Sequence, residues 1–167
     1  MEGKTVLQKL TYLACQRETA AVDFEPYFYG PFSRDLEKAI DWLQMSEDID
    51  ETVTHLGIAR TGWPVSRSTY RLTEAGVKHA DEDIAHNEAF TGAAEEVLES
   101  AKVEDPNLNP RPLSVAAKVH YLLSNRGDPL TDAQVASSAK DLGWELSDSD
   151  LKKADALLNR LGMIESI

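Results

Sequence analysis

Residues 27–43 read YFYGPFSRDLEKAIDWL, and this stretch decides how the first half of the chain folds. An aromatic segment stops at Gly30-Pro31, because proline fixes its own backbone angle and lacks an N–H donor. Ser33 then stands at an N-cap position, where a hydroxyl accepts a bond from an unpaired helical N–H. The apolar residues that follow are spaced as on a helix: Leu36, Ile40 and Leu43. The stretch therefore predicts an irregular aromatic strand, a tight turn and a helix that runs from Ser33 to about Met45.

A second capped helix is predicted about thirty residues later. Residues 68–76 read STYRLTEAG, which is a strand followed by a Thr73 cap. Residues 57–67 are rich in turn formers and separate this strand from one around residues 52–56, as in a hairpin with a long loop. An amphipathic helix from about Thr5 to Arg17 precedes both units. Helix, short aromatic strand, helix, hairpin and helix is the order of a winged helix-turn-helix, so we expect a mainly α protein with a small β-hairpin (α+β).

The rest of the chain is predicted to be helical, with one interruption. From Thr73 the helical pattern runs almost to Glu104, and Gly92 is the expected place for a kink or break. We expect three parts: residues 1–104 as a winged-helix-like domain with a long C-terminal helix, residues 105–112 as a proline-rich linker, and residues 113–167 as a helical unit. The last unit has three helices, two of them capped by Thr131 and Ser147. It resembles a helix-turn-helix, and whether it is a second copy of that module stays open.

Composition and charge limit the classes of function. The chain has 167 residues with 17 basic and 29 acidic side chains, and a net charge of −12. Cys15 is the single cysteine, which rules out an internal disulfide and indicates a small buried apolar residue. No apolar run approaches the roughly 18 residues of a membrane span, and residues 1–5 lead into a helix without the features of a secretory signal. We expect a cytoplasmic protein without a membrane partner.

The charges are distributed unevenly, and this bears on nucleic-acid binding. Residues 74–112 carry three basic and ten acidic side chains, so the middle segment is the most acidic part of the chain. The hairpin loop is the nucleic-acid candidate, because no acidic residue lies between its first arginine and Glu74. Its candidate contact residues are Arg60, Arg67, Arg71 and Trp63. Such a loop can place arginines beside phosphates, although a solvated hairpin paired with the acidic segment is the alternative. The helix after Ser33 fits a major groove poorly, since residues 34–48 hold two basic and five acidic side chains.

No catalytic or cofactor-binding motif is present in the sequence. It contains no glycine-rich phosphate loop, nucleophile elbow or spaced metal motif. The nearest approach to a metal site is His79, Glu82, Asp83 and His86, but two histidines two turns apart are separated by about 10 Å along a helix. A charged exposed face explains these residues better. We therefore expect no enzyme activity, no metal and no cofactor.

Several segments together resemble a known family. They are residues 7–13 (LQKLTYL), residues 24–33, which contain the Gly30-Pro31 turn, and residues 70–73 (YRLT) with Gly76. In this order they resemble the YwgA-type family of small prokaryotic proteins, and more distantly the Panacea or SocA-like antitoxin domains. Residues 117–121 and 142–144 are similar to the same group. The resemblance implies a winged-helix-like fold and a regulatory or antitoxin-like role, and it implies no catalytic residues.

Two functions follow as hypotheses. The first is a winged-helix transcriptional regulator that binds double-stranded DNA as a homodimer, with the arginines of the hairpin on phosphates. The second is a protein-interaction module, antitoxin-like or an adaptor, whose acidic middle segment faces a basic protein partner. We expect self-association through the middle helix, because its apolar stripe exceeds what a small domain covers. We also expect Tyr27, Tyr29 and Phe32 to pack against the first helix rather than bind a ligand.

Overall fold

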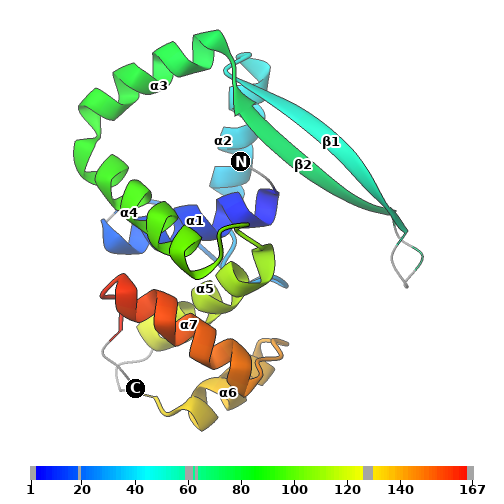
Figure 1. The fold of residues 1–167 in the computed structure, drawn as a ribbon, viewed down its shortest axis with the longest axis vertical. Coiled ribbons are helices and arrows are strands. Elements are labelled where there is room, and N and C mark those ends of the chain that lie inside the picture. The colour runs from blue at the N-terminus through cyan, green and yellow to red at the C-terminus, as the bar shows by residue number, and fades with distance from the viewer. Residues whose placement is uncertain (1–2, 19, 59–61, 63, 126–129, 165–167) are drawn as a thin grey trace.

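A computed structural model describes residues 3–18, 20–58, 62, 64–125 and 130–164 (Figure 1). Within these residues the chain forms seven helices and one two-stranded antiparallel hairpin, which confirms the predicted α+β class. The elements are α1 (Lys4–Arg17), α2 (Arg34–Met45), β1 (Ile49–Ile58), β2 (Pro64–Leu72), α3 (Glu74–His86), α4 (Glu88–Glu104), α5 (Pro110–Ser124), α6 (Asp132–Asp141) and α7 (Asp148–Arg160). The finer winged-helix assignment stays a prediction. No helix among the described residues is both long and apolar enough to cross a bilayer.

One hydrophobic core joins the two ends of the chain. Helices α1, α4, α5 and α7 bury apolar side chains against one another, and the most enclosed include Leu13, Val97, Ala116 and Leu158. Trp144, between α6 and α7, is also buried in this core. The core therefore draws on residues from both sides of the segment 105–112. Helix α5 begins at Pro110, inside the segment predicted to be a linker, so residues 110–112 are its first turn rather than an extended spacer. Proline suits this position because the first helical N–H has no partner in any case.

The predicted helix caps are present. The Ser33 hydroxyl accepts a hydrogen bond from the N–H of Leu36, and Thr131 and Ser147 each form a capping box. The break in the middle segment, however, lies at Asn87 and not at Gly92. Asn87 has a non-helical backbone, and its side-chain amide donates to the carbonyl of Asp83 at 2.9 Å. Gly92 is an ordinary residue inside α4 with open space around it.

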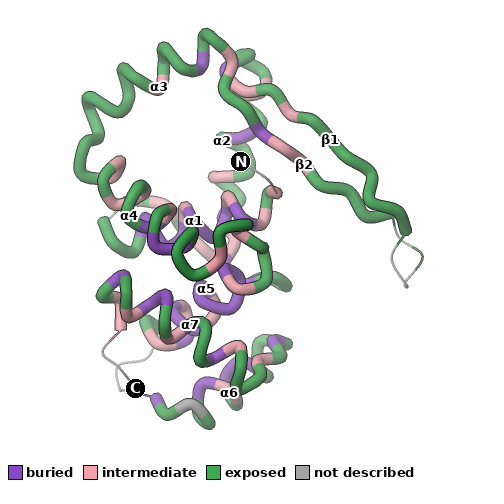
Figure 2. The backbone as a smooth tube through the Cα atoms, viewed as in Figure 1, coloured by how far each residue is buried: buried purple, intermediate pink, exposed green. Residues whose placement is uncertain are grey.

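The hairpin projects from the body as an arm (Figures 1 and 2). This arm consists of β1 and β2. Their register runs from Ile49 opposite Leu72 to Ile58 opposite Pro64. Only the root of the arm, the end next to α2 and α3, is covered. Tyr70 is buried there, and its hydroxyl donates a hydrogen bond to Glu51 at 3.1 Å. All residues of β1 after Glu51 are exposed. A two-stranded sheet with both faces in water is only marginally stable by itself.

Helix α3 is fixed at its first turn and uncovered elsewhere. Thr73 caps it and donates to the carbonyl of Glu47 at 2.7 Å, and His79 Nδ1 lies 2.7 Å from a carboxylate oxygen of Asp48. Gly76 packs directly on the Asp48 carbonyl, where a larger residue would overlap it. Hydrogen bonds from Ser46 and His79 lower the pKa of the Asp48 carboxyl. Apart from Gly76, no residue of α3 is fully buried.

Candidate partner-binding site

The structure describes two of the four residues predicted to contact nucleic acid. Arg67 and Arg71 lie on β2, opposite Thr54 and Asp50, and both are exposed. They are four residues apart on a strand and therefore share one face of the arm. Arg60 and Trp63 lie outside the described residues, so their placement is not described.

The segment 24–33 forms a short, tightly closed hairpin, which we call the aromatic turn. The backbones of Glu25 and Phe32 exchange two hydrogen bonds of 2.9 Å. Gly30 N–H donates to the Tyr27 carbonyl at 2.9 Å, and Tyr27 N–H donates back at 3.3 Å. Gly30 has a φ of +99°, a conformation that disfavours any residue with a Cβ. Phe28 and Tyr29 consequently form the tip of the turn.

Side chains from distant parts of the chain hold the aromatic turn in place. The Gln8 side chain makes two hydrogen bonds with the backbone of Ser33, at 2.9 and 3.0 Å. Lys9 Nζ donates to the carbonyl of Pro31 at 2.6 Å, and Trp144 Nε1 donates to the carbonyl of Tyr27 at 2.8 Å. Both α1 and the C-terminal unit form hydrogen bonds with the backbone of the turn, so the turn is a rigid feature of the fold.

Two lysines lie under the turn. Lys9 is only 2% exposed, and burial together with the nearby Lys118 lowers its pKa to about 8. Burial also lowers the pKa of Lys118, whose ammonium lies 5.3 Å from the centre of the Trp144 ring. The stem of Lys118 passes close to Gly30, so a side chain at position 30 would be crowded. Both lysine side chains thus pack against the backbone of the turn on its buried side.

The aromatic side chains of the tip are in solvent. Tyr27 is 58% exposed, Phe28 71% and Tyr29 58%. The expectation that Tyr27 and Tyr29 pack against the first helix is therefore wrong, because the tight turn directs them outward. Phe32 is half-buried, with its ring 5.2 Å from that of Tyr27. The rings of Phe28 and Tyr29 pack edge to face, with their centres 4.9 Å apart.

Sequence reasoning missed Phe28 as a candidate site residue. The signal was present, because a two-residue turn between Tyr27 and Gly30 leaves its central side chains at the tip. Such residues are normally polar or glycine. Two aromatic residues at the centre of a turn therefore indicate a contact surface rather than a core.

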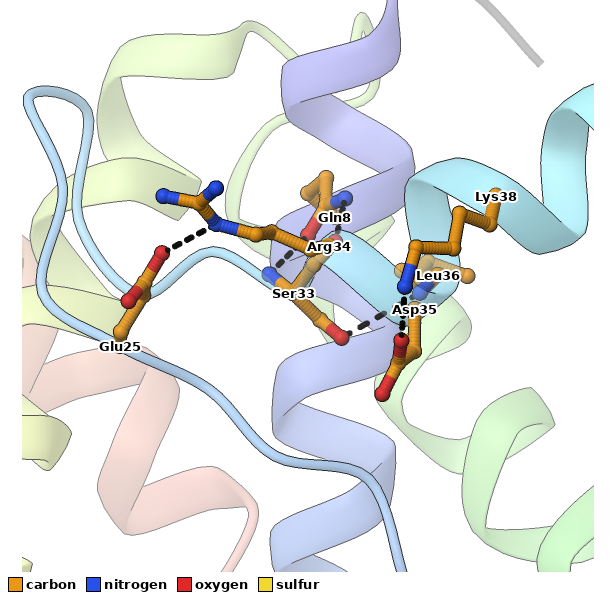
Figure 3. A network of polar contacts seen from close by, with 7 residues as sticks. All are labelled: Gln8, Glu25, Ser33, Arg34, Asp35, Leu36 and Lys38. Atoms are coloured by element: carbon orange, nitrogen blue, oxygen red, sulfur yellow. Dashed lines mark hydrogen bonds and ion pairs between the residues drawn. The ribbon is translucent and has the colours of Figure 1, made fainter.

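The basic residues of α2 form ion pairs with carboxylates, as Figure 3 shows. Arg34 Nε lies 2.9 Å from Glu25 Oε1, and Lys38 Nζ lies 2.9 Å from Asp35 Oδ1. The ion pair with Glu25 also raises the pKa of Arg34. A helix whose cations already face carboxylates has little to offer phosphates or base edges.

The described residues contain no cluster of three side chains that could hold a metal ion. His86, in the group considered from the sequence, instead has Nδ1 2.7 Å from the carbonyl of Glu82. Cys15 is buried in the core, and burial raises the pKa of its thiol, which disfavours the reactive thiolate.

No protein-family model matches this chain, and no curated protein matches its sequence. The resemblance to the YwgA-type family and to antitoxin domains therefore stays a prediction.

Proposed function

We propose that this protein is a protein-interaction module, of the antitoxin-like or adaptor kind, that docks a partner protein through the aromatic turn. The observation that carries the proposal is the exposed tip of Tyr27, Phe28 and Tyr29 on a rigidly held turn. Aromatic anchors dominate the energetics of protein interfaces. An anchor that is already ordered loses little conformational entropy on binding.

The surroundings of the turn favour a protein partner over a nucleic acid. The ammonium of Lys9 is buried and Arg34 faces Glu25, so neither is available to a phosphate without breaking an existing contact. The net charge of −12 also repels a polyanion at long range. The matching partner offers an apolar pocket that accepts the Phe28 ring.

A cross-linking experiment tests the proposal. A photo-reactive phenylalanine analogue replaces Phe28 in the native host, and a second strain carries it at Trp42, which is 69% exposed on α2. We expect a specific protein adduct from position 28. The Kd of that protein for purified Phe28→Ala should rise by about 30-fold or more, the effect of an interface hot spot. Trp42→Ala is the matched control and should leave the Kd unchanged.

The stability of the variants makes the result interpretable. Both side chains are exposed, so each substitution should change the free energy of unfolding by less than about 0.5 kcal/mol. An unchanged Kd for a correctly folded Phe28→Ala variant, or equal losses for both variants, would refute docking through the turn.

DNA binding by a winged-helix transcriptional regulator is the second candidate function. One observation favours it, namely that Arg67 and Arg71 are exposed on one face of the arm. If both contact phosphates, binding to genomic DNA fragments should weaken with salt, and each Arg→Ala change should lower the log–log slope by about one. Absence of binding at about 50 mM salt would eliminate this candidate.

A further inference from the structure

Helix α3 receives little support from its own chain along its length. Its first turn is fixed, because Gly76 packs on the Asp48 carbonyl and His79 contacts the Asp48 carboxylate. From residue 77 to residue 86, every residue except the half-buried Ala80 is exposed, as Figure 2 shows for most of the helix. A helix of 13 residues is only marginally stable in water without packing against other structure. A molecule that covers α3 would therefore stabilise it.

One side of α3 is apolar. Val77, Ala80 and Ile84 recur at positions i, i+3 and i+7, the spacing of a stripe along one side of a helix. Val77 is 47% and Ile84 46% exposed. The stripe extends about 10 Å along the helix axis, at 1.5 Å per residue. It is the part of α3 that a partner can bury.

Carboxylates lie on both sides of this stripe. Asp81 is about 40° from Val77 around the helix, and Asp83 lies on the opposite side, beyond Ala80. The helix has a net charge of −3, because it holds one lysine and four acidic side chains: Lys78, Glu74, Asp81, Glu82 and Asp83. Among the residues that the structure describes, none of the four carboxylates has an ion pair with a basic side chain. The stripe thus has negative edges that its own chain does not neutralise.

These charges decide which kind of molecule fits the surface. A second copy of α3 would place aspartates against aspartates, and like charges in contact weaken association. Nucleic acids and anionic membranes carry the same sign of charge and are repelled as well. A segment with apolar residues on one side and lysines or arginines beside them satisfies both the stripe and the carboxylates. A helix suits this role because two helices interlock their ridges along their length.

We propose that α3 binds a basic amphipathic helix of a partner protein. The apolar side of that helix covers Val77 and Ile84, and its cations pair with Asp81 and Asp83. A single pair of helices buries less than about 1,200 Å² in total, so an affinity in the micromolar range is expected. The contact uses no residue of the aromatic turn. It is a second docking surface, and it does not depend on the first.

A synthetic peptide tests the proposal on the full chain. The peptide is a helix of about 18 residues with leucines at i, i+3, i+4 and i+7 and arginines beside them. Fluorescence anisotropy at low ionic strength should give a Kd in the micromolar range. Val77→Ser/Ile84→Ser should weaken binding by about 10-fold or more. Serine, valine and isoleucine have similar helix propensities, so α3 itself is retained.

Charge variants test the two aspartates. Asp81→Asn/Asp83→Asn should weaken binding of the peptide by about 10-fold. Asp141→Asn/Glu145→Gln makes the same change in net charge at exposed positions of the C-terminal unit and should leave the Kd unchanged. A peptide with glutamates in place of the arginines should bind Asp81→Lys/Asp83→Lys but not the wild type. Phe28→Ala should bind the basic peptide as the wild type does, which separates this surface from the aromatic turn.

Hydrogen exchange locates the contact without any variant. Amides of residues 77–84 should exchange rapidly in the free protein and at least about 10-fold more slowly with saturating peptide. A peptide of the same composition in scrambled order has no apolar side and should bind at least about 10-fold more weakly. Absence of binding, equal binding of the scrambled peptide, or protection confined to another segment would overturn the proposal.

Discussion

The buried imidazole of His120 makes the stability of this protein sensitive to mild acid. His120 lies on α5 and is only 7% exposed. Its Nδ1 lies 2.9 Å from the hydroxyl of Tyr12 and 3.2 Å from that of Ser124, so both neighbours are neutral groups. Burial without a carboxylate partner penalises the imidazolium and lowers the pKa of His120 to about 4.

The direction and size of the effect follow from the two pKa values. In the unfolded chain the His120 pKa returns to its ordinary value of 6.5. Between pH 6.5 and pH 4 the unfolded state therefore binds more protons than the folded state, and the free energy of unfolding falls as the pH falls. From pH 7 to pH 5 this single group should remove about 2 kcal/mol, and about 3 kcal/mol once the pH is below 4.

Urea unfolding at pH 7 and pH 5 measures this effect. His120→Gln keeps a polar side chain but cannot titrate, so its loss of stability between the two pH values should be smaller by about 2 kcal/mol. His55→Gln, on the exposed part of the arm, is the control and should behave as the wild type. The carboxylates contribute equally to all three proteins and cancel in the comparison. Parallel pH profiles for wild type and His120→Gln would refute the argument from burial.

Two further predictions concern close packing and buried charge. Gly76→Ala should destabilise the protein by about 1–3 kcal/mol and increase amide exchange in α3, because its methyl group meets the carbonyl of Asp48. Gly92→Ala, in open space on α4, should instead stabilise by up to about 1 kcal/mol, and equal melting temperatures for the two variants would contradict this. The wild type should gain stability as the pH rises from about 8 towards 10.5, because the folded pKa of Lys9 is about 8. Lys9→Met should abolish that gain in chemical unfolding experiments. If wild type and Lys9→Met show the same dependence of stability on pH, the Lys9 ammonium is adequately solvated in the folded protein.

The exposed aromatic turn and the arm differ in how firmly the rest of the fold anchors them. The turn is held by Gln8, Lys9 and Trp144, so its tip is presented in a fixed geometry. The arm is anchored only at its root. A rigid anchor suits recognition of a preformed pocket. Helix α3 is likewise fixed only at its first turn, so its contact with a partner can be tested separately from that of the aromatic turn.

Local signals in the sequence were sufficient to predict the helices and their starts. Ser33, Thr131 and Ser147 cap helices where the pattern placed them, because a cap depends on atoms within one turn of the chain. The hairpin and the α+β class are predictable for the same reason. Gly76 belongs to the motif of residues 70–76, and its close contact with the Asp48 carbonyl shows why a glycine is required there.

Other features depended on residues far apart in the chain. Tyr27 and Tyr29 look like core residues by composition, yet they are exposed because Trp144 and Lys9 hold the turn at its backbone. The break at Asn87 rather than Gly92 was likewise beyond the helical pattern, which shows a face but not the direction of the next helix. Periodicity states which side chains share a face, whereas burial depends on which distant segment covers that face. For this protein the sequence therefore determined the elements, and only the tertiary structure decided that the aromatic tip, the arm and α3 are left open to other molecules.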